Sequence, residues 1–149
     1  AGRETNDGMG RYVAGRLVRQ LALLGKNLSK ARVILFGLTF KENVPDYRNS
    51  RAVDVIQYLQ EFGIQVLGCE PLLPHDTVRE NFGVEPIGRD NLRNTAPVDA
   101  AVIINKHDAF ATISLETLTG IMDPPVLFDL KNMYKRDSTG TKDIHYLTL

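Results

Sequence analysis

The 149-residue chain has little of several features that would assign it to a specialised class of protein. A single cysteine forms neither an internal disulfide nor a zinc site alone, which predicts a reducing, cytoplasmic environment. Its 18 basic and 18 acidic residues cancel, which removes the positive field that sequence-independent nucleic-acid binding requires. The apolar runs fall far short of the ~20 residues that span a bilayer. We therefore expect neither a nucleic-acid nor a membrane partner.

The sequence also lacks a secretory signal and begins with Ala1 rather than methionine, which fits either a fragment excised from a longer protein or a processed product. Residues 1–32 hold seven basic and two acidic residues, whereas the remainder is net negative. This shift predicts a join between two units, residues 1–29 and residues 30–149.

The first unit has the pattern of an amphipathic helix. Apolar residues recur at three- and four-residue steps from Met9 to Leu24, with Asn6 or Asp7 as the predicted cap and Gly25 as the stop. The apolar stripe needs a surface to cover, either on its own domain or on another chain.

From residue 33 the pattern alternates between buried strands and helices. Residues 33–36 form an apolar run ending in Gly37, a helix is predicted over residues 50–62, and the next strand over residues 64–67. Further strands are predicted at residues 84–87, 100–104, 126–128 and 144–149, with a helix from Ser114 and a turn at residues 138–142. The sequence predicts a Rossmann-like α/β fold, a mostly parallel sheet flanked by helices and preceded by a helical arm.

Ligands of such sheets bind beyond the carboxyl ends of the strands. Three segments are expected at this edge: residues 38–50, 105–108 and 129–132. They would bring four cations to one rim: Lys41, Arg48, Lys106 and Lys131. Cations with backbone amides suit a phosphate or diphosphate. Each charge alone is as well explained as a solvated loop residue, but their convergence favours anion binding.

A standard NAD site is disfavoured on this domain. The dinucleotide fingerprint G-x-G-x-x-G needs a second glycine so that the backbone can approach the pyrophosphate, and here Gly37 is followed by bulky residues. The acid after the second strand, Glu70, follows Gly37 by 33 residues instead of roughly 20.

No catalytic or metal-binding constellation is recognisable in the sequence. Cys69 lies inside a strand pattern and is interpreted as a buried structural thiol. The three histidines lack metal-ligand spacing, and no serine lies in G-x-S-x-G.

Residues 37–50, G-L-T-F-K-E-N-V-P-D-Y-R-N-S, resemble the G-x-x-F-K-x-x-x-x-D-x-R-x-S segment of the UDP-glucose/GDP-mannose dehydrogenase family. That segment opens the family's C-terminal nucleotide-sugar-binding domain. The likeness extends over nearly the whole chain, through Glu70-Pro71, residues 99–104 and residues 128–131. The start of the chain, around Arg3, Asn6 and Asp7, is similar to the helix leaving the family's central domain. The bacterial branch acting on UDP-N-acetylhexosamines for surface polysaccharides is the most similar.

The resemblance implies an NAD-dependent oxidation of the sugar C6 alcohol to a carboxylate, in two steps, through a cysteine-bound thiohemiacetal. The NAD loop and the catalytic cysteine would lie upstream of Ala1, so this chain would contain no catalytic residue and be inactive alone. NAD would be bound mainly by the absent N-terminal domain. A homo-oligomer, with dimerisation through the helical arm, is a further expectation.

The resemblance also assigns roles by position. Phe40 and Lys41 would hold the UDP-sugar, and Arg48 would reach across the cleft to the NAD. Lys131 matches a position where relatives carry arginine for the substrate, and lysine keeps the charge but loses bidentate hydrogen bonding. Two alternatives remain: a free-standing Rossmann-type nucleotide-binding module in which Glu70 grips a ribose, or a dimerisation module with an incidental basic rim.

Overall fold

The structure, a computed structural model, describes residues 2–141 and 143–149, with the backbone alone for residues 2–7. In this part of the chain six strands form one sheet in the order β3-β2-β1-β4-β5-β6. The strands are β1 (Arg32–Phe36), β2 (Gln65–Cys69), β3 (Glu85–Pro86), β4 (Ala100–Ile103), β5 (Val126–Asp129) and β6 (His145–Leu147). All pairings are parallel. This is the Rossmann strand order, so the predicted fold is confirmed, and the sheet is wholly rather than mostly parallel.

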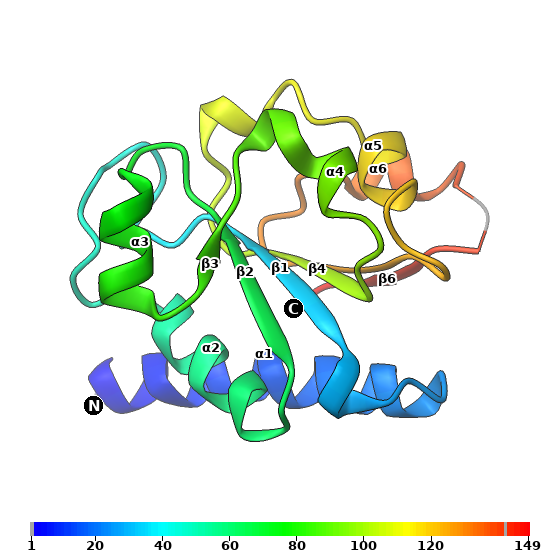
Figure 1. Cartoon of the computed structure of the whole chain (residues 1–149), viewed down its shortest axis with the longest axis horizontal. Coiled ribbons are helices and arrows are strands. Elements are labelled where there is room, and N and C mark those ends of the chain that lie inside the picture. The colour runs from blue at the N-terminus through cyan, green and yellow to red at the C-terminus, as the bar shows by residue number, and fades with distance from the viewer. Residues whose placement is uncertain (1, 142) are drawn as a thin grey trace.

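Helices cover both faces of the sheet (Figure 1). One layer contains α1 (Gly2–Leu23), α2 (Ala52–Glu61) and α3 (His75–Phe82). The other contains α4 (Leu92–Thr95), α5 (Leu115–Thr119) and α6 (Lys135–Ser138), together with the single turns η2 (Arg89–Asn91) and η3 (Asp108–Phe110). A third such turn, η1 (Leu28–Lys30), joins α1 to β1.

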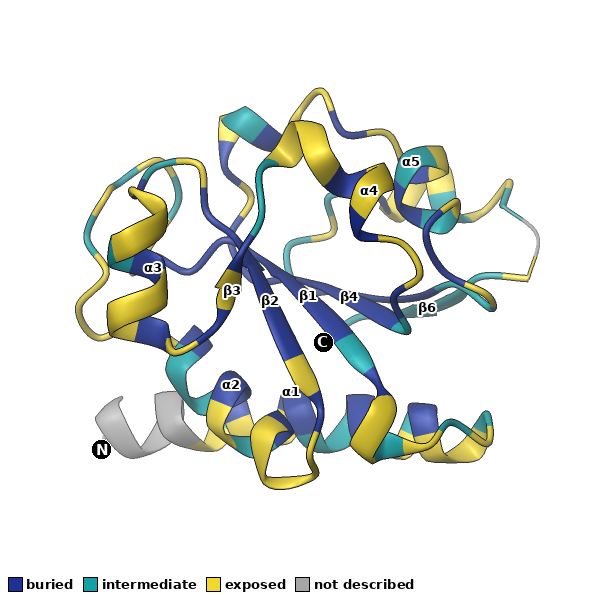
Figure 2. Ribbon diagram, viewed as in Figure 1, coloured by how far each residue is buried: buried dark blue, intermediate teal, exposed yellow. Residues whose placement is uncertain are grey.

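The central strands β1, β4 and β5 are buried on both faces, which is why they are nearly continuous apolar runs (Figure 2). Successive side chains alternate: Val33 and Leu35 of β1 face the core beneath α1 and α2, and Ile34 and Phe36 face the core on the other side. On that side the rings of Phe36 and Phe110 meet edge to face, with centroids 5.6 Å apart.

The first helix ends where the sequence predicts but begins earlier. Gly25 has a φ of +75°, and its N–H donates to the Ala22 carbonyl while the Lys26 N–H donates to Leu21, each at 3.0 Å. These two bonds form a Schellman cap. The predicted caps Asn6 and Asp7 are wrong, because α1 begins at Gly2 and runs through them. Their side chains, like that of Arg3, lie outside the described part of the structure.

The apolar stripe of α1 covers its own domain. Val13, Leu17 and Leu21 are fully buried in the core that α1 shares with α2 and the sheet. The Arg16 guanidinium lies 5.0 Å from the Phe128 ring centroid and donates to the Thr148 carbonyl at 2.6 Å. The helical arm therefore packs against a surface of its own chain. The division at residues 29/30 stays a prediction, although one core extends across it.

Elsewhere the predicted strands and helices are confirmed, but three helices, α3, α4 and α6, were not predicted. The helix α5 begins after Ser114, whose hydroxyl accepts the Thr117 N–H at 3.1 Å, and β6 forms the predicted edge strand. Asp76 lies in the first turn of α3. A short helix, α6, precedes the turn that was predicted to start at residue 138, and Lys142 at the end of that turn lies outside the described residues.

Truncating Leu17 tests whether α1 belongs to the folding unit. Leu17→Ala should lower the free energy of unfolding by about 2–4 kcal/mol, because a fully buried side chain is lost from the core. The matched control is Leu23→Ala in the same helix, where the side chain is 71% exposed and the change should stay within about 0.5 kcal/mol. Urea unfolding measures both, and equal values would show that α1 does not stabilise the domain.

Candidate functional site

The ends of β1 and β4 meet at the switch point of the sheet, where chain connections diverge to opposite faces. Gly37 follows β1 with a φ of +87°, and a Cβ placed there would lie 2.6–2.9 Å from Asn105 atoms. Only glycine permits this approach. The Asn105 amide then donates to the Thr39 carbonyl, which joins the loop after β1 to the segment after β4.

A buried carboxylate after β2 organises the same loop. Glu70 is 3% exposed, and its Oε1 accepts the N–H groups of Leu38 at 2.8 Å and Thr39 at 3.1 Å. Its Oε2 accepts the Leu72 N–H at 3.0 Å. Both carboxylate oxygens of Glu70 are therefore occupied by hydrogen bonds within the protein, which contradicts the alternative in which Glu70 binds a ribose.

His107 connects Glu70 to the segment after β4. Its Nδ1 accepts the Asn43 N–H at 3.0 Å, so the ring proton is assigned to Nε2, which donates to Glu70 Oε1 at 2.9 Å. The ring is 1% exposed. Sequence reasoning placed residues 105–108 at this edge but did not identify His107, since Glu70 lies 37 residues away along the chain.

The environment of Glu70 favours its ionised form. Burial by itself raises the pKa of this carboxyl, but hydrogen bonds from His107 and from the Leu38 and Leu72 amides outweigh burial and hold the pKa below its ordinary value of 4.5.

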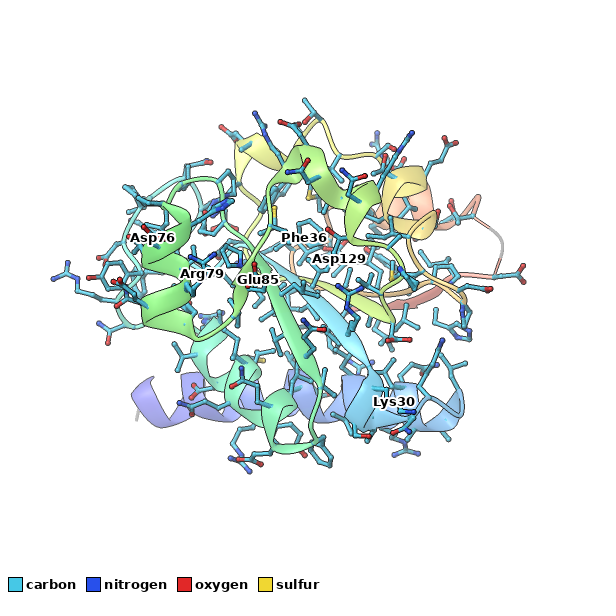
Figure 3. All side chains as sticks on the ribbon, viewed as in Figure 1. Lys30, Phe36, Asp76, Arg79, Glu85 and Asp129 are labelled. Atoms are coloured by element: carbon cyan, nitrogen blue, oxygen red, sulfur yellow. The ribbon has the colours of Figure 1, made fainter. Side chains whose placement is uncertain are left out.

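A second buried carboxylate, Asp129 at the end of β5, fixes the segment that carries Lys131. Its Oδ1 accepts the N–H groups of Lys131 at 3.3 Å and Met133 at 3.0 Å. Its Oδ2 accepts the Tyr134 N–H and the Tyr146 hydroxyl, both at 2.7 Å. Figure 3 shows Asp129 within the molecule. Burial raises the pKa of Tyr146, and the hydrogen bond to Asp129 adds to this, so the phenol stays a donor.

Three predicted residues come together at this edge. Phe40, Lys41 and Lys131 line one cavity of about 310 Å³, which reaches from the loop after β1 across β4 to the segment after β5. Phe40 is 52% exposed, so an aromatic face is available to a ligand. Glu42 and Arg51 line the same cavity and were not singled out from the sequence.

Two of the four expected rim cations do not line this cavity. Lys106 lines a neighbouring cavity of about 710 Å³, beside Ser114 and Tyr134. The Arg48 side chain is 77% exposed and pairs with Asp46, with Nε–Oδ1 at 3.0 Å and Nη2–Oδ2 at 3.1 Å. Neither residue lines the cavity of Lys41 and Lys131, so the four cations do not share one cavity, and their joint role in anion binding stays a prediction.

Cys69 is the structural thiol that the sequence predicts. It is 1% exposed in the core, and burial, followed by the nearby Glu70 charge, raises its pKa to about 12. A thiol of this kind is not ionised at neutral pH and is a poor nucleophile.

The first strand–loop–helix does not fit NAD. It has one glycine, and the Leu38 and Thr39 amides that would face a pyrophosphate are bonded to Glu70. The described residues also contain no group of three or more potential metal ligands. Within the same part of the chain, no helix has both the length and the apolar content needed to cross a bilayer.

The fold and the cavity define a Rossmann-type α/β domain with a cavity lined by lysine and aromatic side chains at the switch point of its sheet. Residues 34–136 match the model of the UDP-glucose/GDP-mannose dehydrogenase family, UDP binding domain. The chain belongs to this family.

Individual relatives of known name are consistent with this family assignment. The UDP-N-acetyl-D-glucosamine 6-dehydrogenase of Pseudomonas aeruginosa is 34% identical over 143 residues, covering 95% of this chain and 33% of that protein. The UDP-glucose 6-dehydrogenase of Rhizobium meliloti is 31% identical, covering 87% and 29%. A structure of the UDP-N-acetyl-mannosamine dehydrogenase from Staphylococcus aureus superposes with a TM-score of 0.73 at 30% identity, covering 99% and 32%. The chain therefore spans about a third of the length of these relatives.

Replacing the buried carboxylate tests its role at the strand ends. Glu70→Gln should lower the free energy of unfolding by about 2–4 kcal/mol at pH 7. The carboxylate has two charged oxygens that accept hydrogen bonds from three backbone N–H groups and from His107, whereas the glutamine amide has one neutral acceptor oxygen. The control, Glu80→Gln on the exposed surface of α3, should change it by less than about 0.5 kcal/mol.

The same pair of proteins gives a pH dependence. A carboxyl whose pKa is lowered by folding adds stability above its unfolded pKa, and this stability is lost as the pH falls through the folded pKa. The difference in unfolding free energy between wild type and Glu70→Gln should therefore be full at neutral pH and shrink below the ordinary value of 4.5. A difference independent of pH would contradict the ionised state of Glu70.

Proposed function

We propose that this chain supplies the UDP-sugar-binding part of an NAD-dependent nucleotide-sugar 6-dehydrogenase, which oxidises the sugar C6 alcohol to a carboxylate. The observation that carries the proposal is the cavity in which Phe40, Lys41 and Lys131 converge. Two cations next to an exposed aromatic ring suit a nucleoside diphosphate, because the cations neutralise phosphate and the ring stacks on a base.

The substrate class is a UDP-N-acetylhexosamine. This is supported by relatives from Pseudomonas aeruginosa and Salmonella typhi, each named a UDP-N-acetyl-D-glucosamine 6-dehydrogenase and each 34% identical. The chain covers about a third of those proteins, so the NAD-binding and catalytic residues belong to upstream domains of the same polypeptide. A homo-oligomeric enzyme in the cytoplasm completes the proposal, in keeping with the charge balance and the single cysteine.

Arg48 acts on the cofactor side of the site. Its guanidinium is exposed and oriented by Asp46 rather than directed into the cavity, which supports a role toward an NAD molecule held by another domain. The loop that carries it is closed by the Phe40 N–H, which donates to the Asp46 carbonyl at 2.7 Å. The cavity residue Phe40 and the ion pair of Arg48 are therefore parts of one ordered loop.

Lys41→Ala should weaken UDP binding by about 1–3 kcal/mol, the scale of a charged hydrogen bond. The matched control is Lys30→Ala, at the opposite edge of the sheet beside α1 (Figure 3), which should leave the affinity unchanged. Amide NMR titration with UDP measures both affinities and maps the site, with shifts expected in residues 38–50 and 129–132. Unchanged affinity for Lys41→Ala would remove Lys41 from the site.

A parallel titration distinguishes the cofactor role. Arg48→Ala should leave the UDP affinity of this chain close to that of wild type, because its proposed partner is bound to another domain. NAD should cause no shifts around Gly37 and Glu70. A large loss of UDP affinity in Arg48→Ala would instead assign Arg48 to the nucleotide-sugar site.

A further inference from the structure

The carboxylate of Glu42 lies between the three segments that form the cavity. Glu42 itself belongs to the loop after β1, and its Oε1 is 3.5 Å from Lys131 Nζ after β5. The same oxygen accepts the Lys106 N–H after β4 at 3.4 Å. An anion from the protein therefore already contacts one of the two cations assigned to the phosphates.

Glu42 is held as an anion without being locked in place. Burial raises the pKa of its carboxyl, but the backbone amides and Lys131 outweigh burial and lower that pKa. The side chains of Glu42 and Lys131 are each 34% exposed, so water reaches both partners. Long hydrogen bonds and partial exposure describe an ion pair that can open at small cost.

The backbone around Glu42 is fixed although its side chain is not. The Lys41 carbonyl accepts the Thr39 hydroxyl at 2.9 Å, and the Asn43 N–H donates to buried His107. Asn43 Oδ1 also accepts the Asp108 N–H at 2.9 Å. Movement of the Glu42 carboxylate away from Lys131 therefore needs rotation about its side-chain bonds and no rearrangement of the loop.

A phosphate that binds Lys131 meets this carboxylate. Two anions that share one cation at contact distance repel each other, so the ligand either displaces Glu42 or loses the contact with Lys131. Lys41 and Arg51, on the same cavity, carry the remaining positive charge.

We propose that Glu42 is the resident counter-anion of the phosphate site: it pairs with Lys131 in the free protein and is displaced when a nucleoside diphosphate binds. It limits the affinity for phosphate charge, since every ligand must break the Glu42–Lys131 pair. This inference rests on the proposed function, because it takes the cavity as the site of the diphosphate.

The test is a UDP titration of wild type and Glu42→Gln, followed by amide NMR. Glutamine keeps the size and the hydrogen-bonding oxygen of Glu42 but removes the charge. Glu42→Gln should bind UDP about two- to fivefold more tightly, the range of an exposed ion pair. Glu61→Gln, at the end of α2 and away from the cavity, removes the same charge from the chain and should bind UDP as wild type does.

A double-mutant cycle separates displacement from general electrostatics. In a Lys131→Gln background, Glu42→Gln should improve UDP binding less than it does with Lys131 present, because the pair is already broken. The same gain in both backgrounds would overturn the proposal, as would unchanged or weaker binding by Glu42→Gln. Glu42→Ala serves as a second variant, and urea unfolding checks that each protein folds.

The outcomes also separate this inference from the proposed function. If wild type binds UDP and Glu42→Gln gains nothing, the counter-anion role fails and the UDP site stands. If only Glu42→Gln binds, the counter-anion role is supported in its strongest form. If neither binds at millimolar UDP, the cavity is not a diphosphate site in this chain, and both proposals fail.

Discussion

The carboxylate of Glu70 is the constraint on which the geometry of the site depends. It joins the backbone after β1 to the end of β2, and through His107 to the segment after β4. After β5, Asp129 holds the backbone in the same way, by accepting hydrogen bonds from the N–H groups of Lys131 and Met133. In both cases a buried carboxyl group accepts hydrogen bonds from the amide N–H groups of a loop that also carries a lysine, so the backbone is held in place while the lysine side chain lines the cavity.

This arrangement explains how a Rossmann-type sheet can serve a nucleotide without the usual glycine-rich loop. Backbone N–H groups after the first strand are the donors that a dinucleotide fingerprint directs at a pyrophosphate. Here those of Leu38 and Thr39 are bonded to Glu70, so the proposed site relies on the side chains of Lys41 and Lys131 to bind phosphate charge. Flexible lysine side chains can follow a phosphate that shifts its position, whereas backbone N–H groups are fixed in place by the conformation of the turn.

The strands were predictable from the sequence because burial on both faces leaves continuous apolar runs, and Gly37 and Gly25 mark real backbone requirements. The helix α3 was not predictable, because Val78 and Phe82 are its only buried residues. Two apolar positions are too few to show a helical periodicity in the sequence. Strand-end position predicted that Lys41 and Lys131 lie at one edge of the sheet, and both line the same cavity. The Glu70–His107 pair was not, because no local pattern encodes a contact between residues so far apart. The ion pair between Arg48 and Asp46 was not predicted either, although the two residues lie only two positions apart.

The packing of α1 has a consequence for how such domains are exchanged. The family match begins at residue 34, whereas Val13, Leu17 and Leu21 fill part of the core from the preceding helix. The segment that the family model matches is therefore smaller than the packed unit. A chimaera that transplants only residues 34–136 into a relative would inherit a foreign first helix against its core, so exchange between members of the family requires the helix and the sheet to travel together.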